Sequence, residues 1–197
     1  KLITQDYAIE SIDVNEDFPN ELEPNAVALY LAKKKAAAYQ LKFRTEIIIT
    51  SDTTVILDGQ ILGKPETEEE GFQMLQSLSG RSHDVNTGVY ISQGEKKISV
   101  SEFTQVYIPE LTSEVIYDYL NRFQPMDKAG AYGIQECCKT PSSLYSVSEL
   151  SFVKQAEESR LFESNPNPSF EIKEIQGSFF NVVGFPIVAV KKALENF

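Results

Sequence analysis

The sequence has 197 residues, which is the size of one ordinary domain and enough to bury a hydrophobic core. Hydrophobic residues make up 42% and charged residues 24%, which excludes a disordered chain, and no apolar run approaches the roughly 18–20 residues that a membrane helix needs. With 29 acidic and 18 basic side chains the formal net charge is −11, which repels a phosphate backbone and argues against general binding of DNA or RNA.

The first predicted elements are a short strand over 7–12, an acidic loop over 13–20, and a helix from Pro24 to about Gln40. Pro24 suits the first turn of a helix, because the N–H that proline lacks has no partner there in any case. The helix carries the consecutive lysines 33–35, and successive helical residues are separated by about 100° around the axis. At least one of these lysines must therefore point away from the other two.

A run of β-branched residues predicts a strand buried on both faces. It covers Glu46–Thr50 and continues to Leu57, where Asp58-Gly59 predicts a tight turn. A helix follows, because Thr67–Glu70 fits a capping box with Thr67 as the N-cap, and Gly80 is placed to close that helix.

The rest of the chain predicts a hairpin, followed by helical and extended segments around a glycine-rich stretch. That stretch, residues 129–135, has too much glycine to be an ordinary helix. Strands and helices alternate, with some strands adjacent, which predicts an α/β fold with a mixed sheet flanked by helices. The predicted elements are strands at 83–92 and 97–108, a helix at 112–123, a candidate helix at 150–161, a strand at 171–176, a turn at 177–181 and a last helix at 186–196.

Asp52 is the first candidate for chemistry, because it follows the isoleucine run at the mouth of a buried strand, where α/β sheets place ligand-binding groups. A carboxylate between the hydroxyls of Ser51 and Thr53 can bind a hard cation or accept a proton from water. Lys64 follows twelve residues later, and Pro65 restricts its backbone to an extended direction, so its ammonium can return to the same site. The alternatives, a strand-end aspartate without chemistry and a solvated surface lysine, stay open on the residues alone.

The remaining reactive residues favour structural roles. His83 is the single histidine and has no serine–acid partners in a catalytic spacing, so we expect a half-buried strand histidine. Cys137 and Cys138 are adjacent, which rules out a disulfide framework and predicts inert thiols in a reducing compartment. The first ten residues lack the apolar core of a signal peptide, so we expect a soluble cytoplasmic protein. Without a Walker-type loop, the residues alone lead to an acidic α/β enzyme with a carboxylate–lysine site.

Seven blocks, in order from about residue 13 to residue 190, closely resemble the Maf family of nucleotide pyrophosphatases. Several such blocks in the family's order are far more specific than any single one. They are Asp13–Glu16, Leu31–Ala36, Ser51–Val55, Gly63–Pro65, Leu78–Val89, Asp127–Gln135 and Gly177–Pro186.

The resemblance implies hydrolysis of a nucleoside triphosphate to the monophosphate and pyrophosphate, with Mg²⁺ or Mn²⁺. It also implies a long, curved mixed sheet flanked by helices, with two lobes and a central cleft, in a protein that is frequently a homodimer. The pairs Asp52-Thr53 and Ile134-Gln135 are similar to those of the branch that cleaves dTTP and UTP.

The resemblance further implies a site of six residues, with the neighbouring Lys33 and Lys34 left as ordinary helix lysines. The six are Asp52 as general base and metal ligand, Glu16 as second metal ligand, Lys35 and Lys64 as phosphate-binding cations, and Thr53 and Gln135 as contacts of the pyrimidine base.

Two departures from the family pattern bear on the domain organisation, for which we expect one Maf-like domain over 1–197. The family's first strand and its arginine loop are missing ahead of Lys1, and we expect them to belong to the protein outside this sequence, because loss of a central strand would expose sheet edges. About residues 136–170 form an insertion, which can be a lid, a partner surface or a disordered segment. The rival functions are a purine (inosine or xanthosine) triphosphate pyrophosphatase and a non-catalytic regulator of cell division and septum formation.

Overall fold

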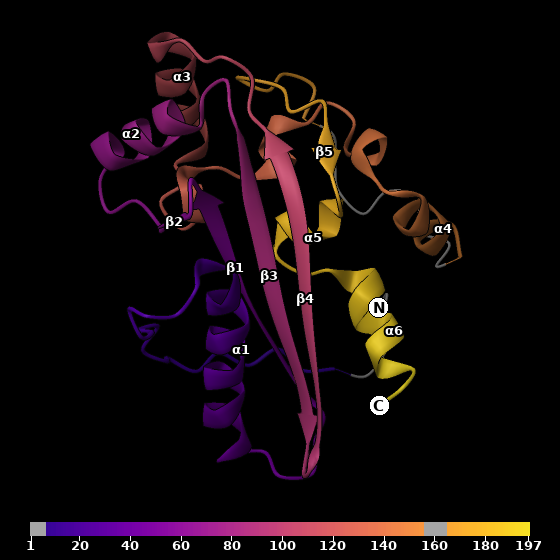
Figure 1. Cartoon of the computed structure of the whole chain (residues 1–197). Helices are drawn as coiled ribbons and strands as arrows, with labels where there is room; N and C mark the ends of the chain where they lie inside the picture. The colour runs from indigo at the N-terminus through magenta and orange to yellow at the C-terminus, as the bar shows by residue number, and fades with distance from the viewer. Residues whose placement is uncertain (1–6, 156–164) are drawn as a thin grey trace.

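The computed structural model describes residues 7–155 and 165–197 and is built around one open sheet with helices on its faces (Figure 1). The strand order is β2-β1-β3-β4-β5, and every pairing among these strands is antiparallel. The helix-flanked sheet is confirmed, but the sheet is antiparallel where a mixed one was predicted. Tight hairpin turns account for the β1–β2 and β3–β4 pairs, while longer connections join β1 to β3 and β4 to β5. The strands are β1 (Ile48–Leu57), β2 (Gln60–Leu62), β3 (Ser82–Gln93), β4 (Lys96–Tyr107) and β5 (Ile175–Gln176).

Two hairpins account for most of the sheet. The predicted turn at Asp58-Gly59 joins β1 to β2, and both residues have positive φ, 52° and 76°, as a type I′ turn requires. The predicted second hairpin is also confirmed, since β3 and β4 pair along twelve residues each and Gly94 turns with φ 57°.

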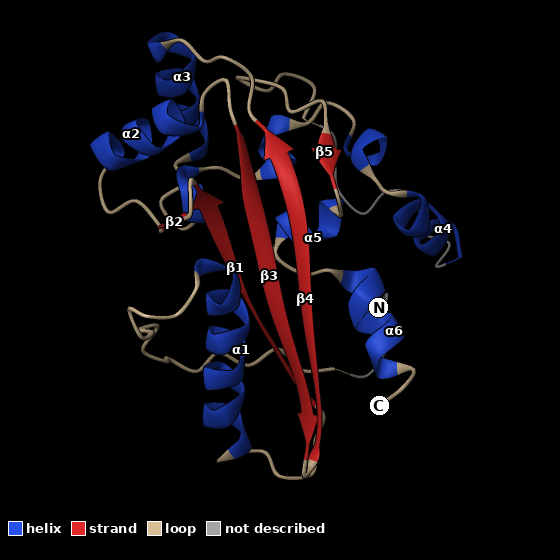
Figure 2. Cartoon of the chain, viewed as in Figure 1, coloured by secondary structure: helices blue, strands red, loops and turns tan. Residues whose placement is uncertain are grey.

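Helix α1 (Pro24–Gln40) begins at the predicted proline and lies across β1 and β3 (Figure 2). Its backbone approaches β3 so closely that a Cβ added at Gly88 would lie 2.3 Å from the backbone nitrogen of Leu29. Only glycine fits at this point of the strand. The buried alanines at positions 28, 32 and 36 of α1 allow the same close approach.

Side chains of the sheet also fasten α1 by hydrogen bonds to its backbone. Asn86 of β3 donates to the carbonyl of Asn25 over 2.8 Å, and Thr50 of β1 donates to the carbonyl of Ala32 over 2.7 Å. The two bonds lie about two turns apart along the helix, so its direction on the sheet is fixed. This determines where Lys35, three residues after Ala32, meets the sheet.

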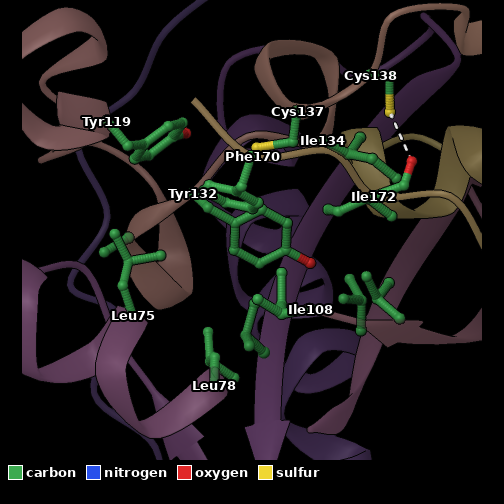
Figure 3. Close-up of a cluster of buried hydrophobic side chains, with 14 of the residues drawn as sticks. Leu75, Leu78, Ile108, Tyr119, Tyr132, Ile134, Cys137, Cys138, Phe170 and Ile172 are labelled. Carbon is green, nitrogen blue, oxygen red and sulfur yellow. Dashed lines mark hydrogen bonds between the residues drawn. The ribbon is translucent and has the colours of Figure 1, made fainter. Parts of the chain in front are cut away.

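The structure has two hydrophobic cores, one large and one small. The larger core fills the end of the sheet covered by α2 (Glu68–Leu78) and α3 (Ser113–Phe123), and Figure 3 shows its centre around Tyr119 and Tyr132. The smaller core joins Val89 and Ile91 of β3 to α6 (Ile187–Leu194). Between the two cores, residues 51–53 of β1 are only partly buried.

The helix termini follow the sequence signals closely. Thr67 caps α2 by accepting from the N–H of Glu70, and Thr112 caps α3 in the same manner. The carboxylate of Glu70 reaches back to the N–H of Glu66, one residue before the position that the standard capping box uses. No helix in the described ranges is long and apolar enough to cross a membrane.

The described part of the expected insertion packs into the larger core. The short turns η2 (Ile134–Cys137) and η3 (Pro141–Leu144) and helix α4 (Val147–Gln155) bury apolar side chains there; residues 156–164, where the candidate helix was to end, lie outside the described residues. Glu149 of α4 is 1% exposed and accepts hydrogen bonds from Ser178 Oγ over 2.6 Å and the N–H of Phe180 over 2.9 Å. This carboxylate anchors α4 to the start of α5 (Phe179–Val183), a short helix where a turn was predicted.

Two predicted strands differ from the structure. Residues 7–12 form no strand; Ile9 is 87% exposed, so the segment buries too little apolar surface to hold a place in the sheet. Of the strand predicted at 171–176 only β5 pairs with the sheet. Ile172 instead donates its N–H to the carbonyl of Cys137 over 2.8 Å, so the chain before β5 is held by the preceding turns and not by β4.

Candidate active site

Asp52 lies in the middle of β1 and not at its end, because the strand continues unbroken to Leu57. The expectation of a strand-end carboxylate is therefore wrong in position. Asp52 is directly opposite Gly88 of β3, and the close approach of α1 at that glycine places the helix over it. The result is a carboxylate with 12% side-chain exposure in the gap between the two cores.

Three predicted site residues meet at one ammonium group. Lys35 of α1 places its Nζ 2.5 Å from Oδ1 of Asp52 and 2.8 Å from Oε1 of Glu16. The side chains of Lys35 and Glu16 are 25% and 49% exposed, so the cluster is open to solvent on the side of Glu16. Residues from a loop, a helix and a strand thus converge as predicted.

The two carboxylates of this cluster differ in acidity. Burial raises the pKa of Asp52, although the hydrogen bond from Lys35 acts in the opposite direction. The hydrogen bond from Lys35 lowers the pKa of Glu16, and the charge of Lys64 adds to that effect. Burial by itself would lower the pKa of Lys35, but its two carboxylate partners raise it. Asp52 is therefore the more basic carboxylate, while Glu16 stays ionised at neutral pH.

The three consecutive lysines diverge, as the helix geometry predicted. Lys35 reaches the carboxylates, Lys33 lies over the ring of Tyr90 with 5.9 Å to its centroid, and Lys34 donates to the backbone carbonyl of Asp17 over 2.8 Å. Asp17 follows Glu16 directly, so Lys34 tethers the loop that carries the second carboxylate. The sequence gives no signal for this contact, because it joins a side chain to a backbone carbonyl.

Of the two remaining predicted site residues, Lys64 acts electrostatically on this cluster, while Gln135 lies in a turn packed on the larger core. Lys64 is exposed, yet its charge is near enough to lower the pKa of Glu16 and to oppose the rise in the pKa of Asp52. The N–H of Gly130 donates to the carbonyl of Gly63 over 3.0 Å, which ties the glycine-rich turns to the residue before Lys64. Gln135 lies half-buried in η2, the second of these turns.

Thr53 faces away from Asp52. Its hydroxyl lies 2.8 Å from that of Thr87 on β3, which in turn donates to the carbonyl of Asn181 in α5 over 2.9 Å. Successive residues of a strand point to opposite faces of the sheet, so Asp52 meets α1 while Thr53 meets α5. These two predicted site residues are adjacent in the sequence, but the structure places their side chains on opposite faces of the sheet.

The histidine and the cysteines lie inside the larger core. His83 is 3% exposed, more buried than predicted; its Nε2 lies 2.7 Å from the Tyr132 hydroxyl, and burial lowers its pKa to about 4. Both cysteines are buried and free, as Figure 3 shows, and burial raises the pKa of Cys138 to about 12. Thiols in this state are poor nucleophiles, which agrees with the prediction of inert cysteines.

The helix-flanked sheet and the cluster of Asp52, Glu16 and Lys35 agree with the family that the sequence comparison identifies. The chain belongs to the Maf family: the family profile described as Maf-like protein matches residues 1–142.

Individual relatives match almost the whole chain. A protein of Porphyromonas gingivalis is 38% identical over 94% of this chain and 80% of its own length, and one of Bacteroides thetaiotaomicron is 36% identical over 92% and 80%. A protein of the archaeon Pyrococcus furiosus is 35% identical over 96% of this chain and 84% of its own length. All three relatives are named dTTP/UTP pyrophosphatase.

Proposed function

We propose that this protein hydrolyses dTTP and UTP to the nucleoside monophosphate and pyrophosphate. The observation that carries the proposal is the convergence of Asp52 and Glu16 on the ammonium of Lys35, in a chain whose relatives are named dTTP/UTP pyrophosphatase. A partly buried carboxylate with a raised pKa, next to a fixed cation, suits proton transfer from water beside a phosphate.

Charge balance supports a divalent cation, Mg²⁺ or Mn²⁺, as the cofactor. The two carboxylates and the two lysines at positions 35 and 64 cancel, while a triphosphate brings about four negative charges into a protein of net charge −11. The described residues include no group of three or more His, Cys, Asp or Glu side chains able to hold a metal by themselves. Two carboxylates fit a hard cation that is shared with substrate phosphates, so we assign Asp52 and Glu16 as its protein ligands. When bound, the cation would neutralise phosphate charge.

In the proposed reaction a water molecule attacks the α-phosphorus and Asp52 accepts the proton that the water loses. The bond between the α-phosphorus and the bridging oxygen breaks, and pyrophosphate leaves. Lys35 and Lys64 stabilise the charge on the phosphate oxygens in the transition state. Since Lys35 is already within 2.8 Å of both carboxylates, it also holds Asp52 in place before substrate binds.

Gln135, in the turn η2 that packs on the larger core, is proposed to recognise the pyrimidine nucleobase of the substrate. The amide of Gln135 offers both a donor and an acceptor, which matches the N3–H and O4 of uracil and thymine. A contact between Thr53 and the nucleobase stays a prediction that follows from its place next to Asp52 in β1; in the structure its hydroxyl meets that of Thr87 on the α5 face.

The test is pyrophosphate release from a panel of dTTP, UTP, CTP and the purine triphosphates GTP, ITP and XTP, with Mg²⁺, with Mn²⁺ and with chelator. We expect dTTP and UTP to be cleaved in the presence of either cation and not with chelator. Preferred cleavage of ITP or XTP would support the purine rival, and release from none of the substrates would support the non-catalytic regulator.

We further propose a cytoplasmic homodimer with a nucleoside triphosphate as its only substrate class, and with neither nucleic acid nor membrane as a partner. The acidic net charge supports the absence of a nucleic-acid partner, and the two free, adjacent cysteines support the cytoplasmic location. The homodimer follows from the resemblance to the Maf family. Sedimentation equilibrium of the purified protein would test the dimer, and a single species of 22.1 kDa would contradict it.

A further inference from the structure

The turn that carries Gln135 is closed by one tyrosine of α3. The hydroxyl of Tyr119 accepts from the N–H of Gly133 over 2.9 Å and donates to Oε2 of Glu136. These two partners stand on either side of Gln135 in the sequence, two residues before it and one after it. A single hydroxyl therefore fixes both ends of the short turn from which Gln135 projects.

Glu136 takes part in three further contacts. Its Oε1 lies 3.3 Å from Nζ of Lys128, its N–H donates to the carbonyl of Gly133 over 3.1 Å, and its own carbonyl accepts from the side chain of Asn165 over 2.6 Å. The side chain of Glu136 is 22% exposed, so its charge is partly withdrawn from water and Lys128 compensates it.

The tyrosine is a rigid support for this turn. Tyr119 is 0% exposed, and its ring contacts Phe123 and Phe170 with centroid separations of 5.0 and 5.1 Å. Figure 3 shows its hydroxyl at the side of the core where the turn with Cys137 passes. A side chain packed in this manner has few rotamers available, so its hydroxyl is a fixed point for the turn.

From these contacts we propose that Tyr119 and Glu136, the Tyr119–Glu136 clamp, position Gln135 and thereby set the discrimination between uracil and cytosine triphosphates. The proposal rests on the proposed function of Gln135 as the reader of the pyrimidine edge. Uracil presents N3–H and O4, whereas cytosine presents an unprotonated N3 and an amino group. A primary amide on a backbone that shifts can meet either edge, so discrimination requires that the turn hold the backbone of Gln135, and with it the position of the amide, in one place. The clamp residues act through Gln135 and are positioning residues.

The experiment compares kcat/KM for UTP and CTP in Tyr119→Phe, Glu136→Ala, Glu136→Gln and Gln135→Ala. Tyr117→Phe is the matched control, since Tyr117 is on the same helix but 44% exposed, with its ring stacked on Phe72. Ile116→Val, on the buried face of the same helix, controls for general loss of stability. Hydrogen–deuterium exchange of residues 133–137 reports on the turn without any substrate.

We expect Tyr119→Phe and Glu136→Ala to lower the UTP-to-CTP ratio of kcat/KM by roughly five- to tenfold, mainly through KM for UTP, with faster amide exchange in 133–137. Glu136→Gln keeps an acceptor for Tyr119 and should restore part of the ratio. The two controls should leave the ratio and the exchange unchanged, even where Ile116→Val lowers the melting temperature as much as Tyr119→Phe.

Four results would overturn the proposal. Unchanged exchange in Tyr119→Phe would show that the hydroxyl does not hold the turn. An unchanged ratio in Tyr119→Phe, when Gln135→Ala lowers it, would show that the clamp does not act on selectivity. An unchanged ratio in Gln135→Ala would show that neither Gln135 nor the clamp sets the selectivity, while the proposed hydrolysis of UTP would be unaffected by that result. A wild-type protein that cleaves neither nucleotide would instead refute the proposed function and the selectivity role with it, while exchange still reports on the clamp.

Discussion

Asp52 and Thr53 are neighbours on β1, yet the two faces of the sheet at this level have opposite character. On the α1 face, Asp52, Glu16 and Lys35 form a charged cluster that is partly open to solvent. On the α5 face, Thr53 and Thr87 join a hydrogen-bonded network that passes through Asn181 and Ser178 to the buried carboxylate of Glu149. The comparison shows that one strand separates two kinds of site. The charged groups that must meet a substrate stay near water, whereas the groups that hold the strand are buried and have hydrogen-bond partners within the protein.

The largest expected effect comes from neutralising the charged face. Asp52→Asn should lower kcat for UTP by about 10³-fold, because the base is lost, and leave the melting temperature nearly unchanged, because Lys35 keeps Glu16 as its partner. Asp58→Asn is the matched control at the exposed turn that ends the same strand. Retention of activity in Asp52→Asn would contradict the assignment of the base.

A pH effect is expected on the α5 face of the sheet, where His83 is buried. Its pKa is about 4 in the folded chain and about 6.5 when unfolded, so between these values the unfolded chain binds the extra proton. The contribution of His83 to the free energy of unfolding should therefore be fully present above pH 6.5. The free energy of unfolding should fall by about 3 kcal/mol as the pH drops toward 4. Urea denaturation at several pH values measures this dependence of the free energy of unfolding on pH. His83→Gln should show a smaller dependence between pH 4 and 6.5, and the same dependence in both proteins would contradict the low pKa of His83.

A smaller effect on stability is expected from the centre of the buried network on the α5 face. Asn181 is fully buried and donates to the carbonyl of Val85 over 3.0 Å and to the hydroxyl of Thr104 over 2.9 Å. Asn181→Ala should lower the free energy of unfolding by about 2 kcal/mol, measured by urea denaturation. Asn196→Ala, which removes an exposed bond near the chain's end, should change it by less than about 0.5 kcal/mol. Equal effects of the two substitutions would show that the network contributes little.

The smallest effect distinguishes two adjacent lysines of α1. Lys34→Ala releases the loop behind Glu16 and should lower kcat/KM for UTP by about threefold, since an exposed contact of this kind is weak. Lys33→Ala, its neighbour over the ring of Tyr90, should have no measurable effect on kcat/KM. A larger loss in Lys33→Ala than in Lys34→Ala would contradict the tether.

Local signals in the sequence were reliable wherever one residue decides the backbone. Pro24 begins α1, Thr67 caps α2, and Asp58-Gly59 makes the β1–β2 turn, as predicted. The resemblance to the Maf family also identified Lys35 and Glu16 as partners of Asp52, which no local rule could do, because the loop, helix and strand that carry them are joined only in the folded chain.

The signals failed where a segment's partner decides its structure. Residues 7–12 alternate like a strand but find no place in the sheet, whereas 136–155 looked like an insertion of uncertain structure and pack into the larger core. The sequence alone determined the local turns, the helix caps and the types of side chain at the site, since these depend on a few neighbouring residues. The tertiary structure alone decided that Asp52 and Thr53 serve opposite faces and that Tyr119 closes the Gln135 turn, because both follow from strand pairing and packing between residues distant in the chain.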